Sequence, residues 1–281
     1  MNAIEIKNLT KNYGKMKALD NISLNFSQGR IIGLLGKNGA GKSTLMRCLL
    51  DFLKYKGEIK IFGEVYNPGT LHQRIAFIPD VGCLDDRLTV AQTIQYVSEI
   101  NDNWIDETAK RLLAKSDLPL NQKVKALSKG MKTKLYLLLT ISLDADILLL
   151  DEPTLGLDII FRKEFFNTIL SEFYNEEKTI IISTHQVEEV EHILQDIVFI
   201  DKGKIVLSED IEELKSRYKI ISIPKDREQE LEGISLGLKT EMLGRVSAIV
   251  RSDVEIPDCE IGVPNLSDLF LMKVGGSNEK V

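Results

Sequence analysis

The sequence has few cysteines, and this excludes several classes of protein. Only Cys48, Cys83 and Cys259 occur among the 281 residues, an odd number at wide spacings. Such an arrangement fits neither a disulfide framework nor a cysteine metal site, and a reducing cytoplasm suits it best.

The sequence also lacks a long apolar run. The best candidate, Leu135 to Leu150, is interrupted by hydroxyl and acidic side chains, whereas a membrane span takes about 20 mostly apolar residues. The first residues, Met1 to Lys7, hold no apolar stretch of signal-peptide length. We therefore expect other chains to supply any membrane part of the function.

A basic excess is missing as well. The net charge is −6, from 36 Lys and Arg against 42 Asp and Glu. This balance argues against a protein that coats nucleic acid, and no nucleic-acid partner is expected. With 43% hydrophobic and 28% charged residues, the composition is ordinary for a soluble globular protein with a sizeable core.

A glycine-rich loop is the most informative feature present. It fits the pattern G-x-x-x-x-G-K-[ST] between an apolar run at 31–35 and a helix-forming segment at 45–50. Its residues are Gly36, Lys37, Asn38, Gly39, Ala40, Gly41, Lys42, Ser43 and Thr44. Glycines let backbone N–H groups surround an anion, and the following helix adds the positive end of its dipole. Lys42 can reach the β- and γ-phosphates, and the Ser43 hydroxyl can hold Mg²⁺. The loop predicts a nucleoside triphosphate site; the alternative is a turn that only caps a buried helix.

Two acids follow a second apolar run. Asp151 and Glu152 come directly after residues 147–150, which read as a buried parallel strand. The acids are therefore expected at the carboxyl edge of a sheet, where ligands sit in open α/β folds. Asp151 would hold Mg²⁺, directly or through water, and Glu152 would orient and deprotonate the attacking water. The alternative is an acidic strand end that faces solvent.

Hydrophobic periodicity predicts the order of the elements. Strands are expected at residues 3–6, 22–26, 31–35, 58–62, 147–150, 180–182, 197–200, 204–207, 218–223 and 248–250. Helices are expected within 89–141 and 157–177 and from 265 or 267 to 272, with a frayed end over 275–281.

Six motifs, in this order and at these intervals, resemble those of the ATP-binding-cassette (ABC) ATPases over residues 3 to about 210. They are Tyr13 before a strand, Gly36–Thr44, Leu127–Met131, Asp151–Thr154, Leu155–Asp158 and Ser183–His185. The resemblance implies an α/β fold of the P-loop NTPase class, with a RecA-like parallel-sheet core, an antiparallel β-subdomain and an α-helical subdomain. It implies an ATPase domain over 1–217, with its helical subdomain at about 89–141. Residues 218–281 resemble the small α+β appendage of export subunits, often used in regulation or dimer support.

The resemblance also implies roles for single residues. Tyr13 resembles the aromatic residue that stacks on adenine. Ser128 and Gly130 resemble the signature segment, which contacts the γ-phosphate bound to the opposite subunit. Asp158 resembles the residue that couples the two sites of a dimer. His185 resembles the switch histidine that contacts the γ-phosphate and holds the catalytic water and Glu152, so Glu152, His185 and Lys42 form the expected catalytic set.

The chain departs from the family pattern at two places. Lys129 and Met131 stand where the signature Leu-Ser-Gly-Gly-Gln has glycine and glutamine. Lys129 could add a contact to the γ-phosphate or point to solvent as part of a basic face. Asp80 stands where the family has a glutamine that contacts Mg²⁺ and water; its shorter acidic side chain could still reach the metal. A membrane subunit is expected to dock on residues 81–88.

The resemblance therefore predicts the ATP-binding and ATP-hydrolysing subunit of an ABC transporter. A separate transmembrane permease would hold it on the cytoplasmic face of the cell membrane. Two copies, or this chain and a paralogue, would close head-to-tail around two ATP molecules with Mg²⁺. Export of a drug, antibiotic, peptide, lipid or polysaccharide is the expected use. The alternatives are an ABC ATPase acting on nucleic acid or ribosomes, and a regulatory subunit that binds ATP with little turnover.

Overall fold

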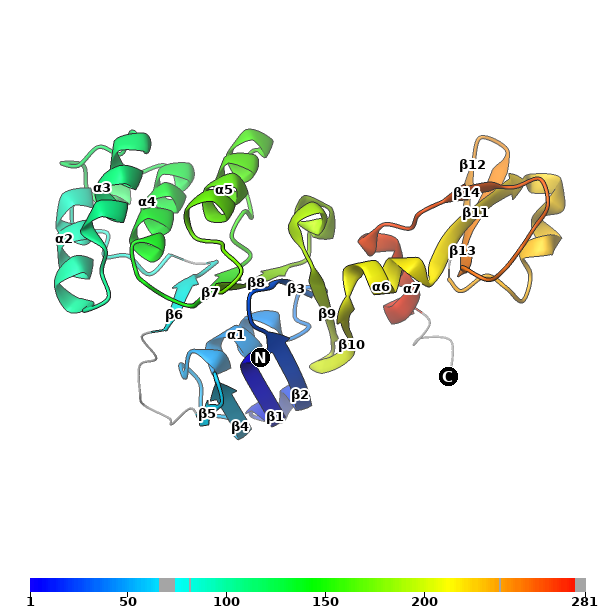
Figure 1. Cartoon of the computed structure of the whole chain (residues 1–281), viewed down its shortest axis with the longest axis horizontal. Helices are drawn as coiled ribbons and strands as arrows, with labels where there is room; N and C mark the ends of the chain where they lie inside the picture. The colour runs from blue at the N-terminus through cyan, green and yellow to red at the C-terminus, as the bar shows by residue number, and fades with distance from the viewer. Residues whose placement is uncertain (66–73, 81, 238, 276–281) are drawn as a thin grey trace.

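The computed structural model describes residues 1–65, 74–80, 82–237 and 239–275. Within these residues the strands form three sheets. A six-stranded sheet lies in the middle of the molecule, and the N-terminal strands form a second sheet beside it (Figure 1). The third sheet, near the C-terminus, extends away from the other two (Figure 1). The α/β fold class predicted from the sequence is confirmed.

The central sheet has the strand order β10-β9-β3-β8-β7-β6. Its strands are β3 (Ile31–Leu35), β6 (Ile75–Ile78), β7 (Ile147–Asp151), β8 (Thr179–Thr184), β9 (Asp196–Asp201) and β10 (Lys204–Asp210). All neighbours are parallel except β10, which forms an antiparallel hairpin with β9. Every residue of β3, β7 and β8 is buried, because helices cover one face of this sheet, and the N-terminal sheet together with one helix covers the other. Parallel strands also bring the ends of β3, β6, β7 and β8 to one edge.

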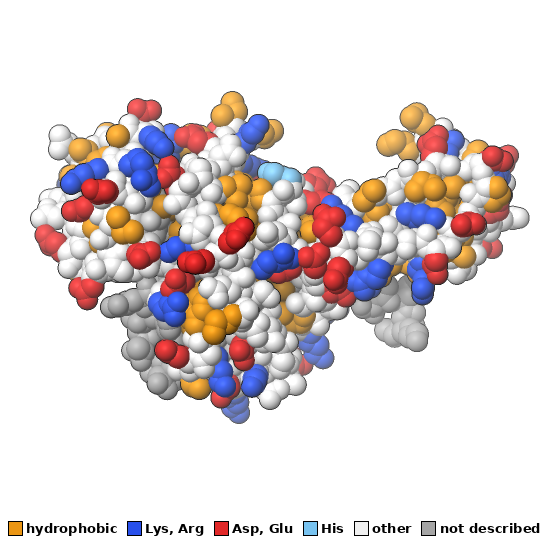
Figure 2. Space-filling model, viewed as in Figure 1, with side chains coloured by type: hydrophobic (Ala, Val, Ile, Leu, Met, Phe, Trp, Pro, Cys, Tyr) orange, Lys and Arg blue, Asp and Glu red, His pale blue; other side chains and the backbone are white. Residues whose placement is uncertain are grey.

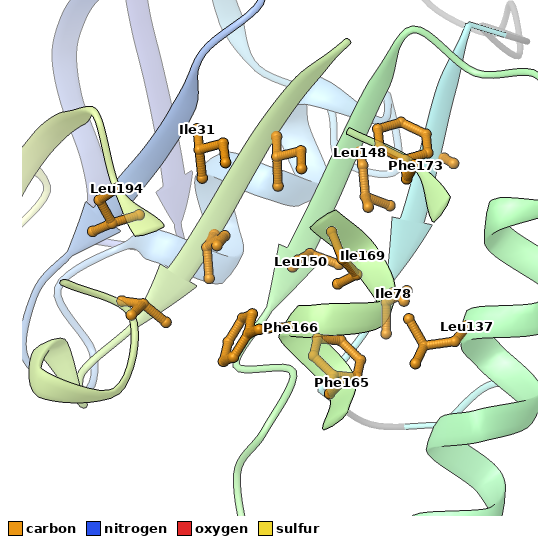
Figure 3. Packing of buried hydrophobic residues seen from close by; sticks show 14 of the residues in the cluster. Ile31, Ile78, Leu137, Leu148, Leu150, Phe165, Phe166, Ile169, Phe173 and Leu194 are labelled. Atoms are coloured by element: carbon orange, nitrogen blue, oxygen red, sulfur yellow. The ribbon is translucent and has the colours of Figure 1, made fainter. Parts of the chain in front are cut away.

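Helices flank this sheet. α1 (Lys42–Leu49) follows β3, and α5 (Ile159–Glu172) connects β7 to β8. Figure 3 shows Phe165 and Ile169 of α5, with Phe173 after it, pointing onto the sheet residues Leu148 and Leu150. Such buried aromatic and aliphatic packing fixes the start of α5 and the loop before it relative to β7. Two short 3-10 turns, η2 (Val187–Glu189) and η3 (Glu191–Ile193), follow β8.

The N-terminal sheet has the order β2-β1-β4-β5. Its strands are β1 (Asn2–Tyr13), β2 (Met16–Ser27), β4 (Lys56–Ile61) and β5 (Glu64–Val65). The predicted strand at 3–6 was too short: β1 continues to Tyr13. Asn8 has a φ of 52°, and the pairing with β2 shifts between Ile6 and Leu9. This bulge breaks the period-2 pattern on which the prediction rested.

The helical segment contains α2 (Val90–Ile100), α3 (Asp106–Lys115), the 3-10 turn η1 (Val124–Ala126) and α4 (Lys129–Ile141). The predicted helical character of 89–141 is confirmed. Glu172, the last residue of α5, accepts hydrogen bonds from Lys115 (2.9 Å) and Arg111 (3.0 Å) of α3. These contacts lower the pKa of Glu172 and tie the helical segment to the core.

The C-terminal residues form α6 (Ile211–Ser216), β11 (Tyr218–Pro224), the 3-10 helix η4 (Lys225–Leu231), β12 (Thr240–Met242), β13 (Arg245–Arg251), β14 (Glu260–Gly262) and α7 (Leu266–Gly275). The antiparallel sheet β12-β13-β11-β14 has a small hydrophobic core of its own. α7 instead returns to the central sheet, where Phe270 meets Phe199 edge to face with ring centroids 5.1 Å apart. Gly275 ends this helix, and the rest of the predicted frayed end, 276–281, lies outside the described residues.

Within the described ranges of the chain, no helix combines the length and apolar character needed to cross a membrane.

Candidate phosphate-binding and catalytic site

A cleft of about 630 Å³ opens at the carboxyl edge of the central sheet. Segments far apart in the sequence line it: the β1–β2 turn, the loop before α1, the end of β6, and the loops after β7, β8 and β9. The lining residues are Tyr13, Met16, Lys17, Ala18, Asn38, Gly39, Gly41, Lys42, Ser43, Thr44, Asp80, Glu152, Leu155, His185, Lys202 and Gly203.

The loop before α1 has the curled backbone that its glycines predict. Gly41 has a φ of 115°, and a Cβ on it would lie 2.7 Å from the carbonyl oxygen of Ala18. The loop carries the Lys42 side chain back over itself, because Lys42 Nζ donates to the carbonyls of Gly36 (2.7 Å) and Lys37 (3.4 Å). Only 5% of Lys42 is exposed. The ammonium is therefore a buried positive charge at the helix N-terminus, an arrangement suited to phosphate.

Asp151, the last residue of β7, is buried in a hydroxyl pocket. Its Oδ1 accepts hydrogen bonds from the hydroxyls of Ser43 (3.0 Å) and Ser183 (2.5 Å). The side chains of β7 and β8 meet here because Asp151 and Ser183 are paired in register. These hydrogen bonds fix the carboxylate beside the start of α1.

Glu152 links the acid pair to Lys42 and His185. Its Oε2 lies 2.9 Å from His185 Nδ1, and its Oε1 lies 3.2 Å from Lys42 Nζ. Oε1 is buried, and its partner in the described part of the chain is the Lys42 ammonium. The backbone of Glu152 has a φ of 46° and donates to the Ser183 carbonyl at 2.9 Å. The residue is thus held in a strained conformation that a packed surrounding must maintain.

The oxygen ligands in the cleft fit Mg²⁺ held together with phosphates. Mg²⁺ in such sites takes one or two carboxylate or hydroxyl ligands and completes its shell with water and phosphate oxygens. Ser43 and Asp151 supply these groups on adjacent elements. In the described ranges, no cluster of three His, Cys, Asp or Glu side chains could hold a metal by itself.

Asp80, after β6, faces the same cleft. Loss of water contact raises its pKa, and the negative charges of Asp151 and Glu152 raise it further. A cation between these carboxylates would relieve the repulsion. Asp80, which stands where the family has a glutamine, therefore lies near the acid pair Asp151 and Glu152.

Tyr13 lies at the end of β1, on the rim of the cleft. It is 42% exposed, and the Lys11 ammonium lies 5.1 Å from its ring centroid. An exposed ring at this place has a face available for a flat base.

Eight of the predicted residues do not line this cleft. Gly36, Lys37 and Ala40 belong to the glycine-rich loop and Asp151 is buried beside Ser43. The other four, Ser128, Lys129, Gly130 and Asp158, lie at the starts of α4 and α5. Ser128 caps α4 by accepting from the Met131 amide at 3.2 Å, and Asp158 caps α5 by accepting from the Phe161 amide at 2.9 Å. Both caps are exposed. They mark two helix N-termini that remain available to another molecule.

The loop after Asp80 is tied to the helical segment. The Tyr136 hydroxyl of α4 accepts hydrogen bonds from the amides of Cys83 and Leu84, the latter at 3.1 Å. Burial of this hydroxyl raises the pKa of Tyr136 to about 12. Within the predicted docking stretch 81–88, Val81 lies outside the described residues.

Sequence reasoning missed several groups around the cleft. Ser183 was part of a motif but received no role, although aligning the two apolar strands would have placed it beside Asp151. Lys202 and Gly203, in the β9–β10 turn, line the cleft, and the Gly203 amide donates to the Ala40 carbonyl at 2.8 Å. No local pattern connects this hairpin to the glycine-rich loop.

Comparison with known proteins adds independent information. A family model described as "ABC transporter" matches residues 19–155. The chain is 34% identical over 221 residues to MJ1023, an uncharacterized ABC transporter ATP-binding protein of Methanocaldococcus jannaschii, covering 75% of this chain and 79% of the relative. It is 36% identical over 225 residues to SrtF, a lantibiotic transport ATP-binding protein of Streptococcus pyogenes, covering 75% and 95%. A relative named for import also matches: PstB 2, a phosphate import ATP-binding protein of Aliivibrio fischeri, is 31% identical over 227 residues, covering 73% and 82%.

Solved structures agree on the fold. The ATP-binding subunit of an ABC transporter superposes with a TM-score of 0.66 at 24% identity, covering 83% of this chain and 96% of that one.

Proposed function

The chain belongs to the ABC transporter family of ATP-binding proteins, and we propose that it powers export through a separate transmembrane subunit. As a member of this family it binds and hydrolyses ATP. Such subunits act as dimers together with transmembrane permeases. The proposal also covers four finer points: the roles of single residues, the metal, the direction of transport and the cargo.

The observation that carries the proposal is the meeting of Lys42, Glu152 and His185. They come from three separate segments, and the Glu152 carboxylate lies 3.2 Å from the Lys42 ammonium and 2.9 Å from the His185 ring. A buried ammonium, a carboxylate and an imidazole at a phosphate-type loop are the groups that phosphoryl transfer to water requires.

In this proposal each residue of the cleft has a separate role in binding or hydrolysis. Lys42 and the backbone of residues 36–44 hold the β- and γ-phosphates, and Tyr13 stacks on the adenine. Ser43, Asp151 and Asp80 would hold Mg²⁺, which when bound neutralises charge on the phosphate oxygens. Glu152 orients the attacking water and takes up its proton on the carboxylate. His185, through Nδ1, fixes the Glu152 carboxylate and faces the γ-phosphate.

A second chain completes each site in this proposal. Ser128 and Gly130 begin α4 outside their own cleft, where the helix N-terminus can receive the γ-phosphate held by the other subunit. The exposed Asp158 beside them couples the two sites. The second chain is another copy or a paralogue.

Export is favoured over import by the match to nearly the whole of SrtF, whose name refers to lantibiotic transport. A peptide antibiotic is accordingly the first cargo class to examine, and the match to PstB 2 makes import the competing direction.

We further propose that residues 1–217 form the ATPase unit and that residues 218–281 form an accessory unit. The whole chain would be held on the cytoplasmic face of the cell membrane. On the face shown in Figure 2, acidic and basic side chains are interspersed. Because a nucleic-acid site needs a concentrated basic surface, this mixture argues against a nucleic-acid partner on that face.

The composite site predicts that turnover depends on protein concentration. At saturating ATP and Mg²⁺, the rate of phosphate release per chain should rise with concentration while the chain is mainly monomeric, and level off as dimers form. Sedimentation and phosphate release over the same dilution series measure both quantities. A constant rate per chain at dilutions where only monomer sediments would contradict the proposal.

A further inference from the structure

The N-terminal turn of α4 binds the loop that follows Glu152 in the same chain. The Lys129 ammonium donates a hydrogen bond to the carbonyl oxygen of Leu155. α4 belongs to the helical segment, whereas Leu155 follows the last strand residue of β7 by only a few positions. The bond therefore connects the signature segment to the catalytic turn across two parts of the fold.

Two glycines make room for close contact between these segments. Gly156 has a φ of +72°, and a Cβ there would lie 2.9 Å from Lys129 Nζ. Gly130, the next residue of α4, lies against the Phe161 ring, where a Cβ would also come within 2.9 Å. Neighbouring residues of α4 thus contact both ends of the segment 155–161.

The backbone of Leu155 is hydrogen-bonded to the backbone of Glu152. The Leu155 amide donates to the Glu152 carbonyl at 3.2 Å, and the Leu157 amide donates to the Thr154 carbonyl at 3.0 Å. Leu155 also lines the cleft. Because these bonds form one tight turn, a shift of the Leu155 carbonyl moves the backbone that carries the Glu152 side chain.

We propose that Lys129 is a positioning residue for ATP hydrolysis, which couples the start of α4 to the turn carrying Glu152 through the Leu155 carbonyl of its own chain. The inference rests on the proposed function, in which the same helix end contacts the γ-phosphate of a second chain. Contact of α4 with that phosphate is then transmitted to the Glu152 of the contacting chain. Lys129 thus connects the γ-phosphate in one site of the dimer to Glu152 in the other site.

The test compares Lys129→Met and Lys129→Arg with the wild type, and uses Lys132→Met as the matched control. Lys132 lies one turn along α4 and pairs with Asp86 at 3.3 Å, away from Leu155. Millisecond hydrogen exchange of the full chain without nucleotide reports on the turn. In Lys129→Met, the amides of Leu155 and Leu157 should exchange about fivefold faster, and Lys129→Arg and the control should exchange like the wild type.

Steady-state turnover is the second readout. In Lys129→Met, kcat should fall roughly tenfold with KM for ATP little changed, because the catalytic carboxylate is displaced while the phosphate loop is intact. Lys129→Arg should restore most of kcat, since it keeps a charged donor.

Three results would overturn the inference. A lower kcat with unchanged exchange means that Lys129 acts on the partner's nucleotide instead. Faster exchange with unchanged kcat means that the contact does not position Glu152, and no change in either means that Lys129 is an ordinary surface residue. A wild-type chain without turnover would overturn the proposed function, and the exchange rates would still decide the contact.

Discussion

Replacing Glu152 by glutamine should lower ATP turnover by roughly 100- to 10,000-fold, the range for loss of a general base, and leave ATP binding intact. The amide keeps the size of the carboxylate and can still accept from His185, but it cannot take a proton from the attacking water. Because ATP binds and persists, the closed dimer should accumulate. Phosphate release, nucleotide binding by fluorescence and sedimentation with ATP measure the three effects.

Glu172→Gln is the matched control for this substitution. Its side chain is as buried as that of Glu152, at 11% against 10% exposed, and it is also paired with cations. It is the last residue of α5, where it pairs with α3, and it does not line the cleft. Turnover of this variant should stay near that of the wild type. A fall of less than about tenfold for Glu152→Gln would assign the base to another group.

The second large effect is expected from Lys42→Ala. The variant removes a buried ammonium from two loop carbonyls and from Glu152, and leaves the phosphates without their cation. Truncating one member of such a buried charge pair usually costs 2–5 kcal/mol, so ATP affinity should fall by at least about 30-fold. Titration with a fluorescent ATP analogue measures this loss.

Lys178→Ala controls for the loss of a half-buried lysine. Lys178 pairs with Asp144 at 2.9 Å outside the cleft. This variant should lose some stability and bind ATP normally. Wild-type affinity in Lys42→Ala would show that the loop backbone alone holds the nucleotide.

Local patterns predicted the central fold because few arrangements satisfy them. The short apolar runs at 31–35 and 147–150, each bounded by turn or acidic residues, are typical of buried parallel strands, and these are β3 and β7. The patterns failed for short or exposed strands. In β12 all three residues are exposed, so alternation gives no signal there.

The same contrast holds for the site. That the glycine-rich loop and the acid pair share one edge follows from parallel strand order, so Lys42 and Asp151 could be placed together from the sequence. The partner of Lys129 could not, because a long side chain reaches many positions and the target is a backbone carbonyl. Ser183 required the register of β7 against β8, which depends on tertiary pairing.

The most direct test of the composite site uses mixed dimers, co-purified through two affinity tags. In one dimer, Glu152→Gln is on one chain and Ser128→Arg on the other; in the second, both substitutions are on one chain and the other is wild type. If each site joins Glu152 of one chain to Ser128 of the next, the first dimer keeps one intact site and should retain roughly half of the wild-type rate. The second dimer should then be inactive. The reverse, an inactive first dimer and a half-active second one, would show that each chain builds its whole site alone and would contradict the account.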